Sequence, residues 1–172
     1  MENTFYETSC DVLVIGAGHA GCEAALAAAR LNMNTVMLTL NLESIAFMAC
    51  NPSIGGTAKG HLVREIDALG GEMGINADKA CMQLRLLNRG KGSAVQSLRS
   101  QSDKHLYHAL MKKTLEETDN LRILQGEAVK ILTEHGKVTG VLTDFGGIIE
   151  AKAVVLATGV YLNAELTTGN WQ

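Results

Sequence analysis

The order of apolar and polar residues along the first 40 positions predicts a strand, a helix and a second strand. Residues 11–15 form a short apolar run that is typical of a strand buried on both faces. The Ala-rich stretch from 19 to about 31 has high helix propensity. Residues 35–39 return to the pattern of a strand. Residues 1–10 are expected to be a loose leader.

The next part of the chain is predicted to contain a loop and then a helix. Residues 41–60 show little periodicity and include the only proline, so we expect a functional loop there. A helix is predicted over 61–69, with Gly70-Gly71 as its stop signal. Its inward face would carry Leu62, Ile66 and Leu69.

Beyond this helix, the pattern predicts a strand, a turn, a helix and another strand. The strand covers 82–87, and the polar turn covers 88–92. A helix is predicted from 102 to about 117, and a short strand over 121–124 brings the chain back to the sheet. The inward residues of that helix would be Leu106 and Leu110.

Short alternating segments predict an antiparallel meander near the end of the chain. Glycine-containing turns separate these segments, which cover 128–132, 137–142 and 148–150. The apolar run 153–157, which ends in Thr158-Gly159, predicts a strand that returns to the parallel sheet beside a ligand. The order of elements therefore predicts an α/β fold.

Composition and charge restrict the class of protein. At 172 residues and 47% hydrophobic residues, the chain is long enough for one globular domain. A formal net charge of -3 does not indicate nucleic-acid binding by the whole chain. The four cysteines lack the spacing of a zinc site or a disulfide framework, which favours a reducing cytoplasm and no metal. No apolar stretch has the length of a signal or membrane segment.

A glycine motif lies between the first predicted strand and the first helix. Residues 16–21, Gly-Ala-Gly-His-Ala-Gly, match G-x-G-x-x-G in the strand and helix context that dinucleotide binding requires. The first glycine permits the tight turn, the second lets the backbone approach a pyrophosphate, and the third lets helix and strand pack closely. The helix N-terminus then faces the phosphates. The predicted cofactor-binding residues are Gly16, Ala17, Gly18, His19, Ala20 and Gly21.

The residue expected to bind the ribose is unusual, because no acidic residue ends the second strand. Thr39 stands there, and its hydroxyl can bind a ribose without the charge of a carboxylate. Glu43 is nearby, but we interpret it as a solvated loop residue. The meander and the final strand favour FAD over the alternative, NAD. The order of parts resembles the Rossmann-like FAD-binding domain of the glutathione-reductase type, in which a parallel sheet with helices is followed by a meander. Gly159 would lie at the cofactor.

Several further segments closely resemble the MnmG (GidA) family over nearly the whole chain. They are Gly18-His-Ala-Gly-Cys-Glu-Ala-Ala25, Cys50-Asn-Pro-Ser-Ile-Gly-Gly56, Lys59 to Gly71, Leu87 to Gly92 and Arg99 to Asp103. The resemblance implies an FAD-dependent enzyme that installs a 5-carboxymethylaminomethyl or aminomethyl group on the wobble uridine of tRNA. It also implies NADH as reductant, methylene-tetrahydrofolate as carbon donor, a homodimer and a partner GTPase of the MnmE type.

The resemblance assigns roles to individual residues. It places Ala128 near the adenine through its backbone, and Cys50 in the modification chemistry. A thiolate could attack the uracil ring or carry a one-carbon adduct, but it needs a lowered pKa. The alternative is that Cys50 is a small packed residue. Six cations could form a basic patch facing tRNA, or could lie on an ordinary solvated surface: Lys59, Arg64, Arg85, Arg89, Lys91 and Arg99.

The length of the chain separates it from the family, whose members continue for several hundred residues more. We therefore interpret residues 1–172 as the N-terminal part of an FAD-binding domain, and we expect this piece alone to bind FAD weakly and to be inactive. Two other functions stay open. The chain could belong to a general FAD/NAD(P)H oxidoreductase acting on a small metabolite, or to a non-catalytic nucleotide-binding module.

Overall fold

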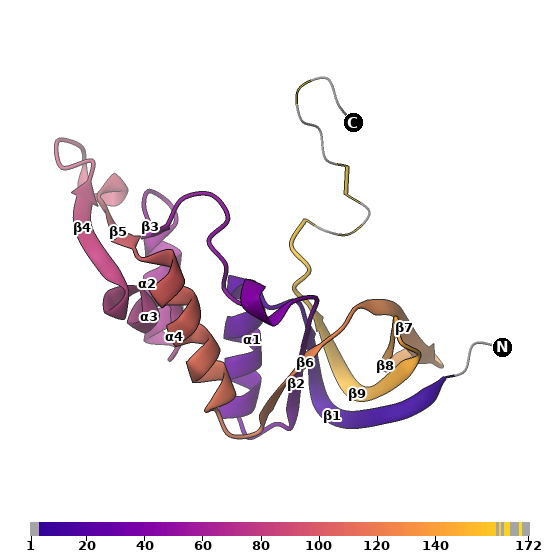
Figure 1. Cartoon of the computed structure of the whole chain (residues 1–172). Coiled ribbons are helices and arrows are strands. Elements are labelled where there is room, and N and C mark those ends of the chain that lie inside the picture. Colours follow the sequence, from indigo (N-terminus) through magenta and orange to yellow (C-terminus); the bar gives the residue numbers. More distant parts are fainter. Residues whose placement is uncertain (1–3, 161, 163, 166–168, 170–172) are drawn as a thin grey trace.

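A computed structural model describes residues 4–160, 162, 164, 165 and 169. Figure 1 shows its two sheets and the helices that lie between them. In chain order the strands and α-helices are β1 (Phe5–Ile15), α1 (His19–Arg30), β2 (Thr35–Thr39), β3 (Ser53–Gly55), α2 (Gly60–Ala68), α3 (Met73–Lys79), β4 (Cys81–Leu87), β5 (Ser97–Ser102), α4 (Lys104–Glu116), β6 (Leu121–Gln125), β7 (Ala128–Glu134), β8 (Lys137–Thr143) and β9 (Gly147–Leu156). Two short 3-10 helices are η1 (Leu42–Ser44) and η2 (Ser93–Val95).

The large sheet has the strand order β6-β2-β1-β9-β8-β7. Strands β6, β2, β1 and β9 run parallel, whereas β7 and β8 add to β9 in antiparallel pairs. The predicted α/β class is confirmed, with its parallel sheet, its helices and its meander.

The large sheet buries side chains on both of its faces. Successive side chains of β1 and β2 point to opposite faces, so each strand contributes to two core clusters. Val14 and Met37 pack against α1 and α4 in one core cluster. Leu13 and Val36 belong to a second cluster, which the meander closes with Val141. Continuous apolar strands are the expected consequence of burial on both faces.

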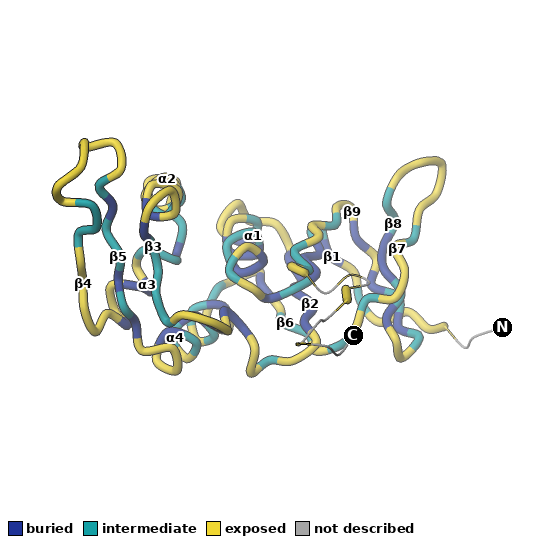
Figure 2. Tube along the Cα trace, turned by 90° about the horizontal axis from the view of Figure 1, so that it is seen from above, coloured by how far each residue is buried: buried dark blue, intermediate teal, exposed yellow. Residues whose placement is uncertain are grey.

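The small sheet has the order β3-β5-β4 and is antiparallel throughout. Figure 2 shows the layers from above: the small sheet, then α2, α3 and α4, then α1 and the large sheet, and finally the meander. Buried residues are concentrated around α1 and the large sheet, while β4 is largely exposed.

Helix α1 is joined to the α2–α3 turn by a partly buried group of polar contacts. The Glu23 carboxylate accepts hydrogen bonds from the backbone N–H groups of Glu72 (3.0 Å) and Met73 (2.6 Å), at the start of α3. Arg30 donates to the Gly70 carbonyl and to the Glu72 carboxylate, both at 2.6 Å. Glu72 is only 5% exposed, so this pairing satisfies a buried charge.

Residues 1–10 were expected to be a loose leader. This expectation is wrong for residues 5–10, which belong to β1. Strand β1 begins at Phe5, which pairs with Gly147 of β9. Residues 148–150 and 153–157 were expected as separate strands, yet Ile148 to Leu156 belong to the single strand β9. Both differences arise because β9 is one long strand. Its first half, from Gly147 to Ala151, pairs with Phe5 to Cys10 of β1.

Two predicted helix faces are right for Ile66 and for Leu110, which packs against the core, and wrong for their other residues. In α2, Leu62 is 57% exposed and Leu69, just beyond the helix, is 89% exposed, while Val63 and Ile66 are half-buried. In α4, Leu106 is 44% exposed and Leu110 is half-buried. The residues that α4 buries are Tyr107, Met111 and Leu115. Strands β3 and β5 and helix α3 were not predicted, because they are short and mostly polar.

None of the helices within the described part of the chain combines the length and the apolar character needed to cross a membrane.

We expect Glu23→Ala to lower the free energy of unfolding by about 2 kcal/mol, because the part-buried N–H groups of Glu72 and Met73 lose their acceptor. The urea midpoint should fall at an unchanged m-value. Glu65→Ala, at an exposed position of α2, is the matched control and should leave the midpoint unchanged. Equal midpoints for the two variants would contradict the assigned role of Glu23.

Candidate dinucleotide-binding site

The carboxyl ends of the four parallel strands meet at one edge of the large sheet. Strands β1 and β9 are neighbours there, with β2 and β6 following on the other side of β1. In open α/β sheets, ligands bind outside the carboxyl ends where the connections diverge to opposite sides. The 16–21 turn follows β1 directly, so it lies at this position.

Two glycines of the turn are required by close packing. Gly16 has a φ of 102°, and its N–H donates to the Leu38 carbonyl at 2.8 Å. A Cβ at Gly16 would overlap the Ala157 carbonyl at the end of β9. A Cβ at Gly21 would overlap the Gly16 carbonyl. Neither position has room for a side chain, because backbone lies against backbone.

Gly18 differs from these two glycines because the space beside it is open. No atom lies within 4 Å of the position of a Cβ, and the backbone (φ -69°, ψ -179°) is open to any residue. Gly18 is the N-cap of α1, and no side chain caps the helix and no acidic residue lies in its first turn. The positive end of the helix dipole is therefore not neutralised, as an anion site requires. Ala17 is buried below the turn, and Ala20 is exposed.

His19 points into the protein rather than toward an open site. Its ring lies 5.5 Å from the Tyr107 ring of α4, and neither His19 Nε2 nor the Tyr107 hydroxyl has a hydrogen-bond partner among the described residues. Burial lowers the pKa of His19 below its ordinary value. A neutral imidazole packed between α1 and α4 suits a structural role.

Thr39 and Ala128 lie on segments that the structure brings together. Thr39 ends β2 and is 6% exposed, and its carbonyl accepts a 2.9 Å hydrogen bond from Gly126 N–H. Its hydroxyl donates to the Asn41 carbonyl at 3.4 Å, a weak bond. Ala128 begins β7, two residues after Gly126, and is half-buried.

Glu43, the acidic alternative, is already engaged by α4. Lys112 pairs with it at 2.7 Å, and His108 lies at 3.6 Å. The hydrogen bond from Lys112 is the main cause that lowers the pKa of the Glu43 carboxyl. Its interpretation as a residue of the exposed loop surface agrees with these contacts.

The end of β9 reaches the glycine turn from the other side. Ala157 N–H donates to the Ile15 carbonyl at 2.8 Å, which continues the ladder up to the turn. Gly159 follows two residues later, is exposed and has a φ of 62°. Gly159 therefore directly follows the Ala157-Thr158 backbone that lies against Gly16.

The loop that carries Cys50 is attached to the same turn. Ala46 N–H donates to the Ala17 carbonyl at 2.8 Å, and His108 Nδ1 lies 2.7 Å from the Ile45 carbonyl. Cys50 itself is exposed, so it is not the packed residue that the alternative interpretation expected.

Some supporting residues carried no signal in the sequence. Cys22 on α1 directs its thiol toward the Ala17 carbonyl at 3.4 Å, and burial raises its pKa to about 12. Tyr107 on α4 fills the space beside His19 and is fully buried. The role of Tyr107 depends on a contact between α1 and α4, and a repeat along one helix does not predict such a contact.

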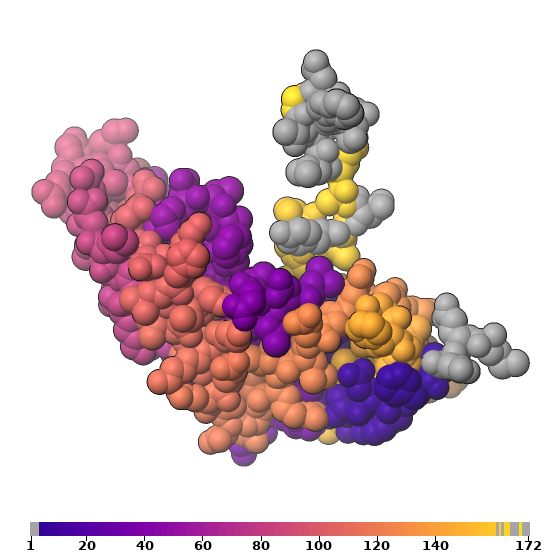
Figure 3. Space-filling model, in the orientation of Figure 1, coloured from indigo at the N-terminus to yellow at the C-terminus, as the bar shows by residue number. Residues whose placement is uncertain are grey.

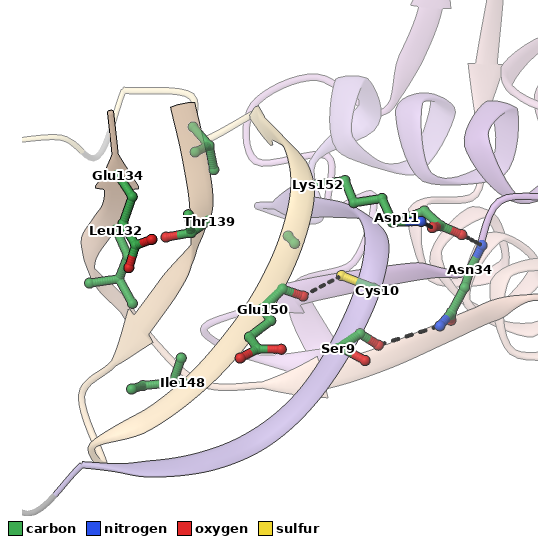
Figure 4. A pocket seen from close by; sticks show the side chains of 12 residues that line it. Ser9, Cys10, Asp11, Asn34, Leu132, Glu134, Thr139, Ile148, Glu150 and Lys152 are labelled. Atoms are coloured by element: carbon green, nitrogen blue, oxygen red, sulfur yellow. Dashed lines mark hydrogen bonds and ion pairs between the residues drawn. The ribbon is translucent and has the colours of Figure 1, made fainter. Parts of the chain in front are cut away.

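An open hollow of about 720 Å³ lies elsewhere, between the start of β2 and the meander (Figure 4). Its polar groups bind one another: Lys152 pairs with Asp11 at 2.6 Å, and Asn34 N–H donates to Asp11 at 2.9 Å. Burial raises the pKa of the Cys10 thiol, which lies 3.6 Å from the Glu150 carbonyl. Because it lies away from the carboxyl ends of the strands, the hollow is no candidate for the dinucleotide.

The described residues contain no group of three His, Cys, Asp or Glu side chains placed to hold a metal ion.

Comparisons with known proteins agree with one family. A sequence model named "Glucose inhibited division protein A" (GIDA) matches residues 11–172. The tRNA uridine 5-carboxymethylaminomethyl modification enzyme MnmG of Alkaliphilus oremlandii is 60% identical over 166 residues, which cover 96% of this chain and 26% of that protein. The chain thus spans about a quarter of the length of such relatives.

Solved structures give the same result for the fold. The GidA structure from Aquifex aeolicus is 54% identical, with a TM-score of 0.87, and the match covers 90% of this chain and 26% of that one. PqsL, a probable FAD-dependent monooxygenase from Pseudomonas aeruginosa, shares the fold at 14% identity and a TM-score of 0.65, over 92% of this chain and 47% of its own.

The half-buried His19, whose Nε2 is shielded from solvent, predicts a pH dependence of stability. Its lowered pKa means that the unfolded state, with a pKa near 6.5, takes up the proton first as the pH falls. The stability contributed by neutral His19 is complete above pH 6.5 and is lost below it. We expect His19→Gln to flatten the fall of the thermal midpoint from about pH 7 to about pH 5. The control His105→Gln, at an exposed site, should keep the wild-type slope, and equal slopes for all three proteins would refute the assignment.

Proposed function

The chain belongs to the glucose inhibited division protein A (GIDA) family, and from this membership we propose that it is the FAD-binding N-terminal part of a tRNA-modifying enzyme. The enzyme would install the 5-carboxymethylaminomethyl or aminomethyl group on the wobble uridine. The name of the 60% identical relative supports the reaction. The glycine turn at the carboxyl edge of the sheet is the observation that carries the proposal.

The residues present at this turn fit the pyrophosphate of FAD. Gly18 leaves room for a phosphate against the backbone, and α1 directs uncapped N–H groups and a positive dipole end toward it. The absence of an acidic residue in the first turn avoids repulsion of the phosphates. When bound, FAD would supply the redox chemistry of the reaction.

The remaining cofactor contacts would come from the ends of other strands. Thr39 would bind the ribose through its hydroxyl, whose present bond to the Asn41 carbonyl is long enough to be exchanged. Ala128 would hold the adenine through its backbone, and Gly159 would let the chain pass close to the cofactor. The hydrogen bond between Gly126 and Thr39 supports the placement of the ribose and adenine contacts side by side.

Cys50 would be the nucleophile. Its thiol is exposed and stands on a loop that Ala46 ties to the glycine turn. A thiolate at this place could add to the uracil ring beside the flavin, or carry the one-carbon unit. Its neighbours Gly55 and Gly56 both have positive φ values, so the loop needs these glycines to turn back toward β5.

The resemblance to the family supports the partners. We propose NADH as the reductant of the flavin, methylene-tetrahydrofolate as the carbon donor, a homodimer, and a GTPase of the MnmE type as the second protein. All four cysteines are free thiols, which suits a cytoplasmic enzyme.

A metabolite oxidoreductase and a non-catalytic nucleotide module are the competing functions. A metabolite oxidoreductase would tolerate loss of Cys50 and would have its flavin reduced by a particular small substrate. A nucleotide-binding module would take up FAD but would not be reduced by NADH. Flavin absorbance before and after NADH, together with activity on unmodified tRNA, separates the three.

Gly18 and Gly21 provide a matched test of FAD binding. Gly18→Ala should leave the thermal midpoint of the apoprotein unchanged, because its Cβ meets no atom, and should weaken FAD binding about tenfold or more by blocking the phosphate. Gly21→Ala should lower stability by about 3 kcal/mol, because its Cβ meets backbone. Calorimetric titration with FAD and thermal unfolding of the apoprotein, both on a protein of the relatives' full length that begins with this chain, measure the two effects. Unchanged FAD affinity in Gly18→Ala would contradict the proposed phosphate site.

Cys50 can be tested in a protein of the relatives' full length that begins with this chain, called the full-length protein below. We expect Cys50→Ser to abolish modification of unmodified tRNA while the flavin spectrum and FAD affinity stay unchanged. Cys81→Ser is the control, because Cys81 is also exposed, and it should retain activity. Modification by Cys50→Ser at the wild-type rate would exclude the nucleophile role.

A further inference from the structure

The β4–β5 hairpin, residues 81–102, is positively charged, whereas the chain as a whole is negatively charged. It carries Arg85, Arg89, Lys91 and Arg99 and contains no Asp or Glu, although the whole chain has a net charge of -3. Figure 3 shows this part of the molecule as an arm that extends away from the body of the large sheet. All the side-chain charges of this projecting hairpin are therefore positive.

Two of these cations oppose each other across the hairpin. Arg85 of β4 pairs in register with Arg99 of β5, so both side chains leave the same face. Like charges directly opposite in an antiparallel pair are destabilising. On the same face the next pair along is Gln83 with Gln101, which carries no neutralising charge.

In the part of the chain that the structure describes, four cations outside the hairpin have acidic partners, one of them Lys113 with Glu117. Arg30 pairs with Glu72, Lys112 with Glu43, and Lys152 with Asp11. Within the described residues, none of the four hairpin cations forms an ion pair. An anion from outside the described chain could therefore bind them without displacing an internal partner.

The turn that carries Arg89 and Lys91 is held in place by side chains. The Gln96 amide donates to the Lys91 carbonyl at 3.0 Å and to the Arg89 carbonyl at 3.4 Å. The Asn88 amide donates to the Val95 carbonyl and to the Thr57 hydroxyl, both at 2.9 Å. The Thr57 contact joins the turn to the segment after β3. An ordered turn lowers the entropy cost of binding.

From these observations we propose that the β4–β5 hairpin binds the phosphate backbone of tRNA, with Arg85 and Arg99 as a strand pair and Arg89 and Lys91 at the turn. The inference rests on the function proposed above and deepens it, because it assigns the tRNA contact to one element. RNA is favoured over an acidic protein because the four cations follow one another along a single hairpin, as contacts to a phosphate backbone require.

The test compares two charge-removing double variants of the full-length protein loaded with FAD. They are Arg85→Gln with Arg99→Gln, and Arg89→Gln with Lys91→Gln. The control is Lys130→Gln with Lys137→Gln on the β7–β8 hairpin, where Lys137 stands opposite Glu134. Fluorescence anisotropy with an unmodified tRNA transcript at several salt concentrations gives the dissociation constant and its salt dependence.

Each hairpin double variant should bind tRNA at least about tenfold more weakly at roughly 0.1 M salt. The slope of log K against log salt should fall in magnitude by about 1.5, as expected for two lost phosphate contacts. The control should keep the wild-type affinity and slope. Wild-type affinity in both hairpin variants, or an equal loss in the control, would overturn the proposal and leave an acidic protein as the partner of the hairpin.

Thermal stability separates binding from folding. Removing the opposed charges in Arg85→Gln with Arg99→Gln should leave the thermal midpoint unchanged or raise it by up to about 2 °C. A fall of several degrees would show that the arginines serve the fold and would overturn the proposal. If the wild-type protein does not bind tRNA at all, the proposed function fails. If it binds and the variants bind equally well, only the assignment to the hairpin fails.

Discussion

The site depends on one constraint, the contact of bare backbone between the end of β9 and the turn that follows β1. Gly16 lies against the Ala157 carbonyl, and Gly21 lies against the Gly16 carbonyl, so two segments that are far apart in sequence meet without a side chain between them. This contact brings the first turn of α1 to the sheet edge and sets its N–H groups toward the space beside Gly18. A phosphate site of this type is made of peptide groups, and it requires their positions to be exact.

Helix α1 also connects this site to the projecting arm. Its N-terminus forms the turn, where Ala17 receives the Cys50 loop through Ala46. Farther along the same helix, Glu23 and Arg30 bind the turn between α2 and α3 that carries the small sheet. The loop with the proposed nucleophile is thus tied to the start of α1, and the small sheet is connected to α1 through α2 and α3.

Sequence reasoning was most successful where a local pattern has one structural solution. The run at 11–15, the glycine turn and the Ala-rich helix predict a βαβ start, because each part suits only that arrangement, and the structure confirms it. It was least successful for the second sheet. Strand β5, with the sequence Ser-Leu-Arg-Ser-Gln-Ser, is mostly polar, and it forms a strand because β3 and β4 pair with it on both sides. Leu62 and Leu69 were assigned to a core, yet no described element covers them.

By itself the sequence determined the class of fold, the glycine turn and the family, since these follow from residue types at short spacings. Only the tertiary structure decided that Phe5 to Cys10 extend β1, that Glu43 is paired with Lys112, and that Arg85 faces Arg99. The physical reason is the range of the interactions. Propensity and periodicity act within one turn or strand, whereas pairing register, ion pairs and opposed charges depend on segments that meet only after the chain has folded.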